Sequence, residues 1–166
     1  FAVRYPDRVL ALVLTSSGAA ALPPKGLDDD VRESISRYGT KEENRALFEA
    51  AVPRYFDALN VTLEDLDNFV ETALLATNPA LRGTLETLYA SPPISREEYA
   101  AIKTPTLIIV GTHDPFGTFD QAVVLSDVLP KSKITVMARC GHSPMWEKPI
   151  EFVKVLADFL EDNGLK

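Results

Sequence analysis

Hydrophobic and polar positions along the chain alternate between strand-like runs and helix-like spacing. Strand-like runs cover residues 9–14, 106–110 and 133–137, and the first of them is a continuous apolar stretch. An unbroken run of this kind predicts a strand buried on both faces, as in a parallel sheet. Helical spacing of apolar residues follows at 119–129 and 149–160. Strands that alternate with helices predict βαβ crossovers, with helices covering both faces of the sheet.

The middle of the chain has a different pattern, in which strand-like runs are absent and acidic, helix-periodic segments replace them. Apolar residues within 47–55 share one helical face, although Pro53 interrupts it. Thr62 and Asp65 have the spacing of a capping box that opens a second helix. A third helical segment is expected around residues 81–88.

These patterns predict the organisation of the chain. We expect an α/β core formed by residues 1–23 and 96–166, interrupted by a helical insertion at residues 24–95. The last helix begins near Pro149, a favoured first-turn residue, and Asn163 with Gly164 is a typical C-terminal stop.

Composition narrows the classes of function. The chain has 166 residues, 46% of them hydrophobic and 25% charged, with a net charge of −7. It has no cluster of lysine and arginine that would favour nucleic acid, no apolar run long enough to span a membrane, and no visible signal peptide. The single cysteine, Cys140, cannot form an internal disulfide and fits a cytoplasmic location. With two histidines and no metal-ligand spacing, we expect neither a metal nor another cofactor.

Candidate chemistry lies just after two of the predicted strands. Asp114 follows the run at 106–111, and His142 follows the run that ends at Met137. Neighbouring parallel strands lie about 4.8 Å apart and end at the same edge of the sheet, so their loops can bring a carboxylate to an imidazole. A carboxylate on one ring nitrogen fixes the tautomer, and the other nitrogen can then take a proton from a nucleophile. Gly111 and Gly141 suit sharp loop exits, because glycine tolerates positive φ.

Three stretches of the chain resemble the α/β-hydrolase superfamily. Residues 5–14 are similar to the stretch after the nucleophile helix, residues 105–114 to the acid strand and its loop, and residues 141–149 to the histidine loop. The helical region resembles the cap that members of this family insert. The resemblance implies that Asp114 is the triad acid and His142 the triad base.

The chain departs from this family pattern in one respect. The G-x-S-x-G nucleophile elbow is absent, and none of the serines stands in such a context. The first residue is Phe1, so we expect the C-terminal portion of a larger enzyme, whose nucleophile is a serine, aspartate or cysteine. The complete enzyme would cleave a small ester, amide, lactone or similar bond without a cofactor. An alternative is a non-catalytic ligand-binding or interaction module. The exposed edge at residues 9–14 would pair with the missing half or with a second copy.

Structural interpretations stand beside the chemical ones. Asp114 could cap a turn, and His113 is expected to be an ordinary loop histidine rather than a pocket or metal residue. Cys140 is expected to be buried and inert. Three residues flank the two loops and are candidates for a substrate-binding wall, with packing under the last helix as the alternative: Phe116, Met145 and Trp146. The aromatic residues of the helical region are expected to form mostly its own core: Tyr38, Phe48, Tyr55, Phe56 and Phe69.

Overall fold

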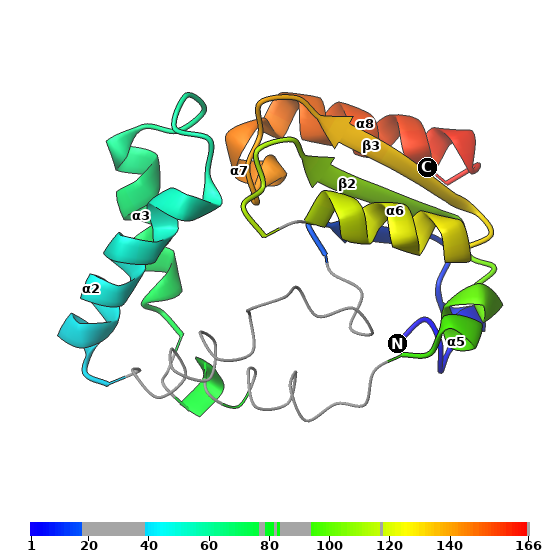
Figure 1. Cartoon of the computed structure of the whole chain (residues 1–166), viewed down its shortest axis with the longest axis horizontal. Coiled ribbons are helices and arrows are strands. Elements are labelled where there is room, and N and C mark those ends of the chain that lie inside the picture. The colour runs from blue at the N-terminus through cyan, green and yellow to red at the C-terminus, as the bar shows by residue number, and fades with distance from the viewer. Residues whose placement is uncertain (18–38, 77–78, 82, 84–93, 117, 166) are drawn as a thin grey trace.

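The fold is built on three parallel strands, seen in a computed structural model that describes residues 1–17, 39–76, 79–81, 83, 94–116 and 118–165. The strands are β1 (Leu12–Thr15), β2 (Thr106–Gly111) and β3 (Ser132–Met137), in the order β1-β2-β3. Leu12 pairs with Thr106, and Ile108 pairs with Ile134. All three carboxyl ends therefore meet at one edge of the sheet, as the sequence predicted (Figure 1).

Helices α6 (Thr118–Val128) and α8 (Pro149–Asp162) cover opposite faces of the sheet. Ile108 and Val110 of β2 pack with the α6 side, while Leu107 and Ile109 pack with Met137, Cys140 and Phe159 on the α8 side. Every residue of β2 is buried, because side chains alternate between two covered faces. The loop that carries Asp114 therefore begins at the end of a fully buried central strand.

Local signals explain where the core helices begin and end. Helix α5 (Arg96–Ala101) opens with a capping box between Ser95 and Glu98. Helix α8 begins at Pro149 and ends in a Schellman motif, in which Gly164 has a φ of 71° and Leu165 N donates to Leu160 O at 2.8 Å. The predicted stop at Asn163–Gly164 is confirmed. A short helix, α7 (Pro144–Glu147), follows the predicted histidine loop and was not expected.

Residues 39–76, here named the helical segment, form a separate small core. It contains α2 (Lys41–Ala51), the 3₁₀-helix η2 (Val52–Tyr55) and α3 (Leu63–Ala73). Pro53 lies inside η2, so the interruption expected there takes the form of a tighter turn. The predicted capping box at Thr62 and Asp65 is confirmed, and Phe48, Tyr55, Phe56 and Phe69 belong to the apolar cluster of this segment. Tyr38 lies outside the described residues.

The first strand differs from its prediction. It spans Leu12–Thr15 rather than residues 9–14, and Leu10 is 74% exposed. The 3₁₀-helix η1 (Pro6–Arg8) occupies the preceding turn. All four strand residues are half-buried, because β1 pairs only with β2 among the described residues. Most of the predicted third helical segment at 81–88, and the start of the predicted insertion at residue 24, lie outside the described residues.

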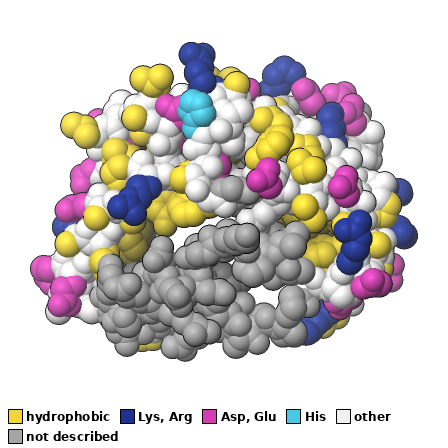
Figure 2. Space-filling model, viewed as in Figure 1, with side chains coloured by type: hydrophobic (Ala, Val, Ile, Leu, Met, Phe, Trp, Pro, Cys, Tyr) yellow, Lys and Arg dark blue, Asp and Glu magenta, His cyan; other side chains and the backbone are white. Residues whose placement is uncertain are grey.

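The described surface is mixed in character. On the face shown in Figure 2, lysine and arginine side chains lie scattered among acidic ones rather than in one patch. Hydrophobic side chains are visible both over the helical segment and over the sheet region. None of the helices in the described ranges is both long and apolar enough to traverse a bilayer.

Candidate active site

Asp114 and His142 meet at the carboxyl ends of β2 and β3. The Nδ1 atom of His142 lies 2.8 Å from Oδ2 of Asp114, a hydrogen-bond distance. The two residues are 28 positions apart in the sequence, and the parallel pairing of their strands brings them together. The predicted contact between acid and imidazole is therefore present in the structure. Because Nδ1 faces the carboxylate, Nε2 is the ring nitrogen that remains to exchange a proton with a reacting group.

The Asp114 carboxylate is buried and held by three donors. Its side chain is only 1% exposed. Besides His142, the backbone N–H of Phe116 donates to Oδ1 at 2.9 Å, and the hydroxyl of Thr118 donates to Oδ2 at 2.6 Å. Burial by itself raises the pKa of Asp114, but the bonds from His142, Thr118 and Phe116 outweigh it and hold the pKa below its ordinary value. The carboxylate of Asp114 therefore stays ionised in a fixed orientation. Its bond from the N–H of Phe116 also caps the local turn, which is the alternative role considered for Asp114.

Two aromatic rings surround the imidazole of His142. The ring of Phe116 lies 4.6 Å away in an edge-on arrangement, and the ring of Tyr55 lies 5.7 Å away. The backbone N–H of His142 donates to the carbonyl of Tyr55 at 2.6 Å. The imidazole remains 29% exposed. The imidazole therefore lies between two aromatic rings and solvent, and one of these rings belongs to Tyr55, which the sequence analysis placed only in the helical core.

Gly111 and Gly141 serve a different purpose from the one predicted. Gly164 is the only described glycine with a positive φ, so neither loop exit uses that conformation. A Cβ on Gly111 would lie 2.2 Å from the carbonyl oxygens of Cys140 and Gly141, and one on Gly141 would lie 2.6 Å from the carbonyl of Tyr55. Glycine is required at both positions because backbones approach closely there. The loops that carry Asp114 (the acid loop) and His142 (the base loop) contact each other, and the base loop contacts the helical segment, through main-chain atoms.

The three proposed substrate-contacting residues lie in different surroundings. Phe116 is half-buried and also stacks on Tyr55 at 5.1 Å. Trp146 is 44% exposed and packs edge-on against Phe69 of α3 at 5.4 Å. Met145 is 40% exposed. Phe116 thus adjoins the imidazole and Trp146 faces the helical segment, while contact with a substrate stays a prediction for all three.

Three other groups near the two loops are His113, Cys140 and the acidic residues Asp57 and Glu147. His113 is not a solitary loop histidine, because its Nδ1 lies 2.6 Å from Oδ2 of Asp57. Cys140 is a buried free thiol, and burial raises its pKa to about 12, which agrees with the inert role expected. No group of three or more potential ligands that could hold a metal ion occurs among the described residues. Asp57 has no distinguishing signal in the sequence, since acidic residues are common throughout the chain, and Glu147 lies in the stretch 141–149 but was given no role there.

Comparisons with known proteins identify the family to which the chain is similar. Residues 2–155 match the model of the alpha/beta hydrolase family. A 2-hydroxy-6-oxononadienedioate/2-hydroxy-6-oxononatrienedioate hydrolase of Paraburkholderia phymatum is 30% identical over 169 residues, which cover 96% of this chain and 57% of the relative. A 2-hydroxy-6-oxo-6-phenylhexa-2,4-dienoate hydrolase of Comamonas testosteroni is 25% identical, covering 98% of this chain and 58% of the relative.

Solved structures show the same fold. A thermophilic esterase from Thermogutta terrifontis superposes with a TM-score of 0.80 at 21% identity, covering 98% of this chain and 60% of the esterase. The chain therefore spans a little over half the length of the curated relatives and of this structure that it matches.

Proposed function

The chain belongs to the alpha/beta hydrolase family, and from this premise we propose that it supplies the acid and the base of a hydrolase that needs no cofactor. The observation that carries the proposal is the 2.8 Å contact between Nδ1 of His142 and the buried carboxylate of Asp114. A carboxylate that is 1% exposed and fixed by Thr118 and Phe116 can orient an imidazole without itself moving.

In the proposed reaction His142 moves a proton twice. When the nucleophile is a hydroxyl, Nε2 takes its proton as the oxygen attacks the carbonyl carbon of the substrate, and the imidazole becomes positively charged. Asp114 stabilises that charge through the Nδ1–H bond. The imidazolium then gives its proton to the leaving group. A water molecule next attacks the covalent intermediate and gives a proton to Nε2, and the imidazolium returns that proton to the nucleophile as the acid product leaves.

The nucleophile of this reaction has no candidate within residues 1–166, because no G-x-S-x-G elbow occurs there. We infer that the elbow and the oxyanion donors belong to a segment of the complete enzyme outside these residues. The share of the relatives that the chain covers, 57% and 58%, supports this inference. The identity of the nucleophile as serine, aspartate or cysteine depends on that segment.

We propose a small, fairly apolar substrate with an ester, amide, lactone or similar carbonyl-activated bond. Phe116 and Tyr55 beside the imidazole, with the half-exposed Trp146 nearby, give this side of the site an apolar character that suits such a molecule. The curated relatives are named as hydrolases of 2-hydroxy-6-oxononadienedioate, 2-hydroxy-6-oxononatrienedioate and 2-hydroxy-6-oxo-6-phenylhexa-2,4-dienoate, which are oxo acids. The helical segment belongs to the region 24–95 that we propose as the cap over the substrate.

A hydrolysis assay tests the proposed division of labour. With p-nitrophenyl acetate as substrate, the full-length protein is expected to turn over and the chain of residues 1–166 alone to show almost no turnover. His142→Ala should abolish the activity of the full-length protein, whereas Lys154→Ala, a change of a 73% exposed side chain, should leave it unchanged. Turnover by residues 1–166 alone that disappears in His142→Ala would contradict the proposal, since the nucleophile would then lie inside the chain.

The edge of β1 that does not face β2 is the surface through which we propose that the chain binds its missing segment or a second copy. This strand pairs only with β2 among the described residues, and exposed strand edges recruit other strands. We expect residues 1–166 alone to sediment as a dimer or larger species, and to become monomeric when the nucleophile-bearing segment is present. Leu10→Lys, at an exposed position just before β1, should weaken the self-association. A monodisperse monomer in sedimentation velocity would contradict this expectation.

The predicted cellular location of the proposed enzyme is argued from its single cysteine. Cys140 is the only cysteine in the sequence and is buried as a free thiol, which fits a reducing environment. The cytoplasm therefore stays the predicted location.

A further inference from the structure

A second buried carboxylate, Glu147 at the end of α7, holds the loop that carries His142. Glu147 is only 6% exposed. Its two oxygens accept hydrogen bonds from the backbone N–H of Gly141 at 3.0 and 2.8 Å, and Oε1 also accepts one from the N–H of Ser143 at 3.2 Å. Gly141 and Ser143 flank His142 on either side. Glu147 therefore fixes the backbone on both sides of the proposed base.

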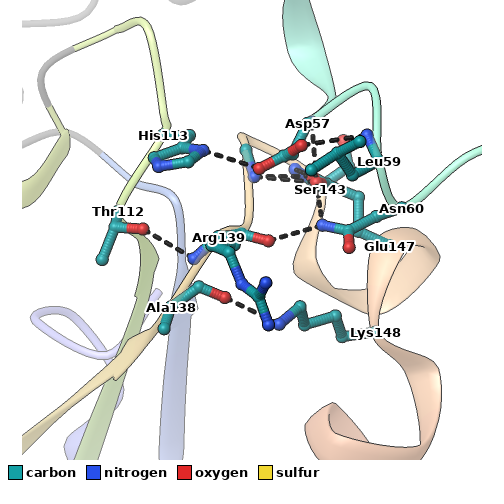
Figure 3. A network of polar contacts seen from close by, with 11 residues as sticks. Asp57, Leu59, Asn60, Thr112, His113, Ala138, Arg139, Ser143, Glu147 and Lys148 are labelled. Atoms are coloured by element: carbon teal, nitrogen blue, oxygen red, sulfur yellow. Dashed lines mark hydrogen bonds and ion pairs between the residues drawn. The ribbon is translucent and has the colours of Figure 1, made fainter.

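The same carboxylate reaches the helical segment at residues 55–60, here named the bridging segment. Oε2 of Glu147 accepts from the backbone N–H of Asp57 at 2.8 Å and from Nδ2 of Asn60 at 3.2 Å. Nδ2 of Asn60 also donates to the carbonyl of Arg139 at 2.5 Å, and Arg139 has a φ of 48°, which non-glycine residues seldom adopt. Figure 3 shows these contacts converging between the bridging segment and the base loop.

The bridging segment also holds the loop that carries the acid. Oδ2 of Asp57 lies 2.6 Å from Nδ1 of His113, the residue directly before Asp114. The Asp57 side chain is 7% exposed, and the hydrogen bonds from the N–H of Leu59 and from His113 keep its pKa below the ordinary value. One short stretch of chain is thus joined to both loops of the dyad, through His113 on one side and Glu147 on the other.

Burial of Glu147 needs an explanation, because a buried carboxylate is costly unless it is well hydrogen-bonded. The donors around it are three backbone N–H groups and one side-chain amide, none of which carries a charge. Hydrogen bonds to an ionised acceptor are about twice as strong as neutral ones, so these donors offset the cost of burial. Oε1 accepts from the base loop, and Oε2 accepts from the base loop and from the bridging segment, so both atoms of the side-chain terminus must be acceptors. Glutamate meets this requirement, whereas glutamine would turn an amide N–H toward other N–H groups.

We propose that Glu147 is a positioning residue for the proposed base. Through Gly141 and Ser143 it holds the imidazole of His142 with Nδ1 on Asp114, and through the bridging segment it makes this alignment depend on the placement of the helical segment. The inference rests on the proposed function, because alignment of His142 affects a rate only if His142 is the base.

Glu147→Gln in the full-length protein tests the inference, with hydrolysis of p-nitrophenyl acetate as one readout. Misplacement of a catalytic group by about 1 Å costs roughly 100-fold in rate, so kcat is expected to fall about 10- to 100-fold while KM changes less than about threefold. The matched control is Glu151→Gln, which removes a carboxylate that is 53% exposed and 3.8 Å from Lys148. Because Glu151 is more than half exposed and its contact with Lys148 is long, this ion pair contributes little, so the control should retain the kcat of the unmodified protein.

A long-range ¹H–¹⁵N spectrum of the histidine rings is the second readout, and it does not depend on catalysis. In the unmodified protein we expect His142 to carry its proton on Nδ1. In Glu147→Gln, a population with the proton on Nε2 should emerge. Substitution of each histidine by glutamine assigns the signals of His113 and His142. A folded Glu147→Gln protein with unchanged kcat and an unchanged His142 tautomer would overturn the inference.

Asn60→Ala serves if Glu147→Gln does not fold. It removes one arm of the network, from a half-buried side chain, and should shift the His142 tautomer and lower kcat in the same direction by a smaller factor. No change in either readout would overturn the inference by this second route. The proposed function fails separately if His142→Gln leaves hydrolysis intact. In that case the difference in His142 tautomer between the unmodified protein and Glu147→Gln still reports whether Glu147 positions the ring.

Discussion

Asp114→Asn in the full-length protein is expected to lower kcat by roughly 10⁴-fold, with a much smaller change in KM. The reason lies in the direction of the hydrogen bonds. The N–H of Phe116 donates to Oδ1, so the asparagine oxygen will occupy that position and its NH₂ group will face His142. Nδ1 must then accept a hydrogen bond, which places the ring proton on Nε2. That tautomer cannot take a proton from the nucleophile.

The matched control for Asp114→Asn is Asp158→Asn. Asp158 is 55% exposed and lies 2.6 Å from the exposed Lys154. The same chemical change there should alter kcat by less than about twofold, because exposed ion pairs contribute little. Steady-state kinetics of both variants, with kcat and KM determined separately, measure the difference. Equal activity of Asp114→Asn and Asp158→Asn would show that Asp114 does not orient a catalytic base.

The second large effect is expected for stability. Gly111→Ala should lower the free energy of unfolding by about 3 kcal/mol or more, because its Cβ would lie 2.2 Å from the backbone carbonyls of Cys140 and Gly141. Backbone atoms cannot rotate away as a side chain can, so the base loop must shift as a whole. Urea unfolding followed by circular dichroism measures the change. The same shift would move His142, so activity should fall along with stability.

Gly83→Ala provides the matched control for this substitution. A Cβ at Gly83 has no atom within 4 Å, and the residue lies in a helical stretch. Alanine there should leave stability unchanged or raise it by up to about 1 kcal/mol, since alanine is the better helix former. If Gly111→Ala were as stable as Gly83→Ala, the close approach of the acid and base loops would be wrong.

The sequence predicted the parts of the molecule that depend on local chemistry and on strand order. The runs at 106–110 and 133–137 became β2 and β3 with small changes of boundary, and Pro149 with Gly164 delimited the last helix. Loops at the ends of neighbouring parallel strands must lie at one edge of the sheet, so the pairing of Asp114 with His142 followed from order alone.

Contacts that join distant segments could not be predicted. Nothing in the local sequence distinguishes Asp57 from the other acidic residues, because its partners His113 and Glu147 are 56 and 90 positions away. The roles of Gly111 and Gly141 were misjudged for the same reason. A glycine required by close approach and a glycine required by positive φ look alike in a sequence, and only the neighbouring backbone separates them.

The protonation state of the His142 ring tests the central claim most directly. A long-range ¹H–¹⁵N spectrum of the full-length protein at neutral pH should show the proton on Nδ1 and a free Nε2, and Asp114→Asn should move the proton to Nε2. A ring that carries its proton on Nε2 in the unmodified protein, and does not respond to Asp114→Asn, would contradict the assignment of Asp114 and His142 as acid and base.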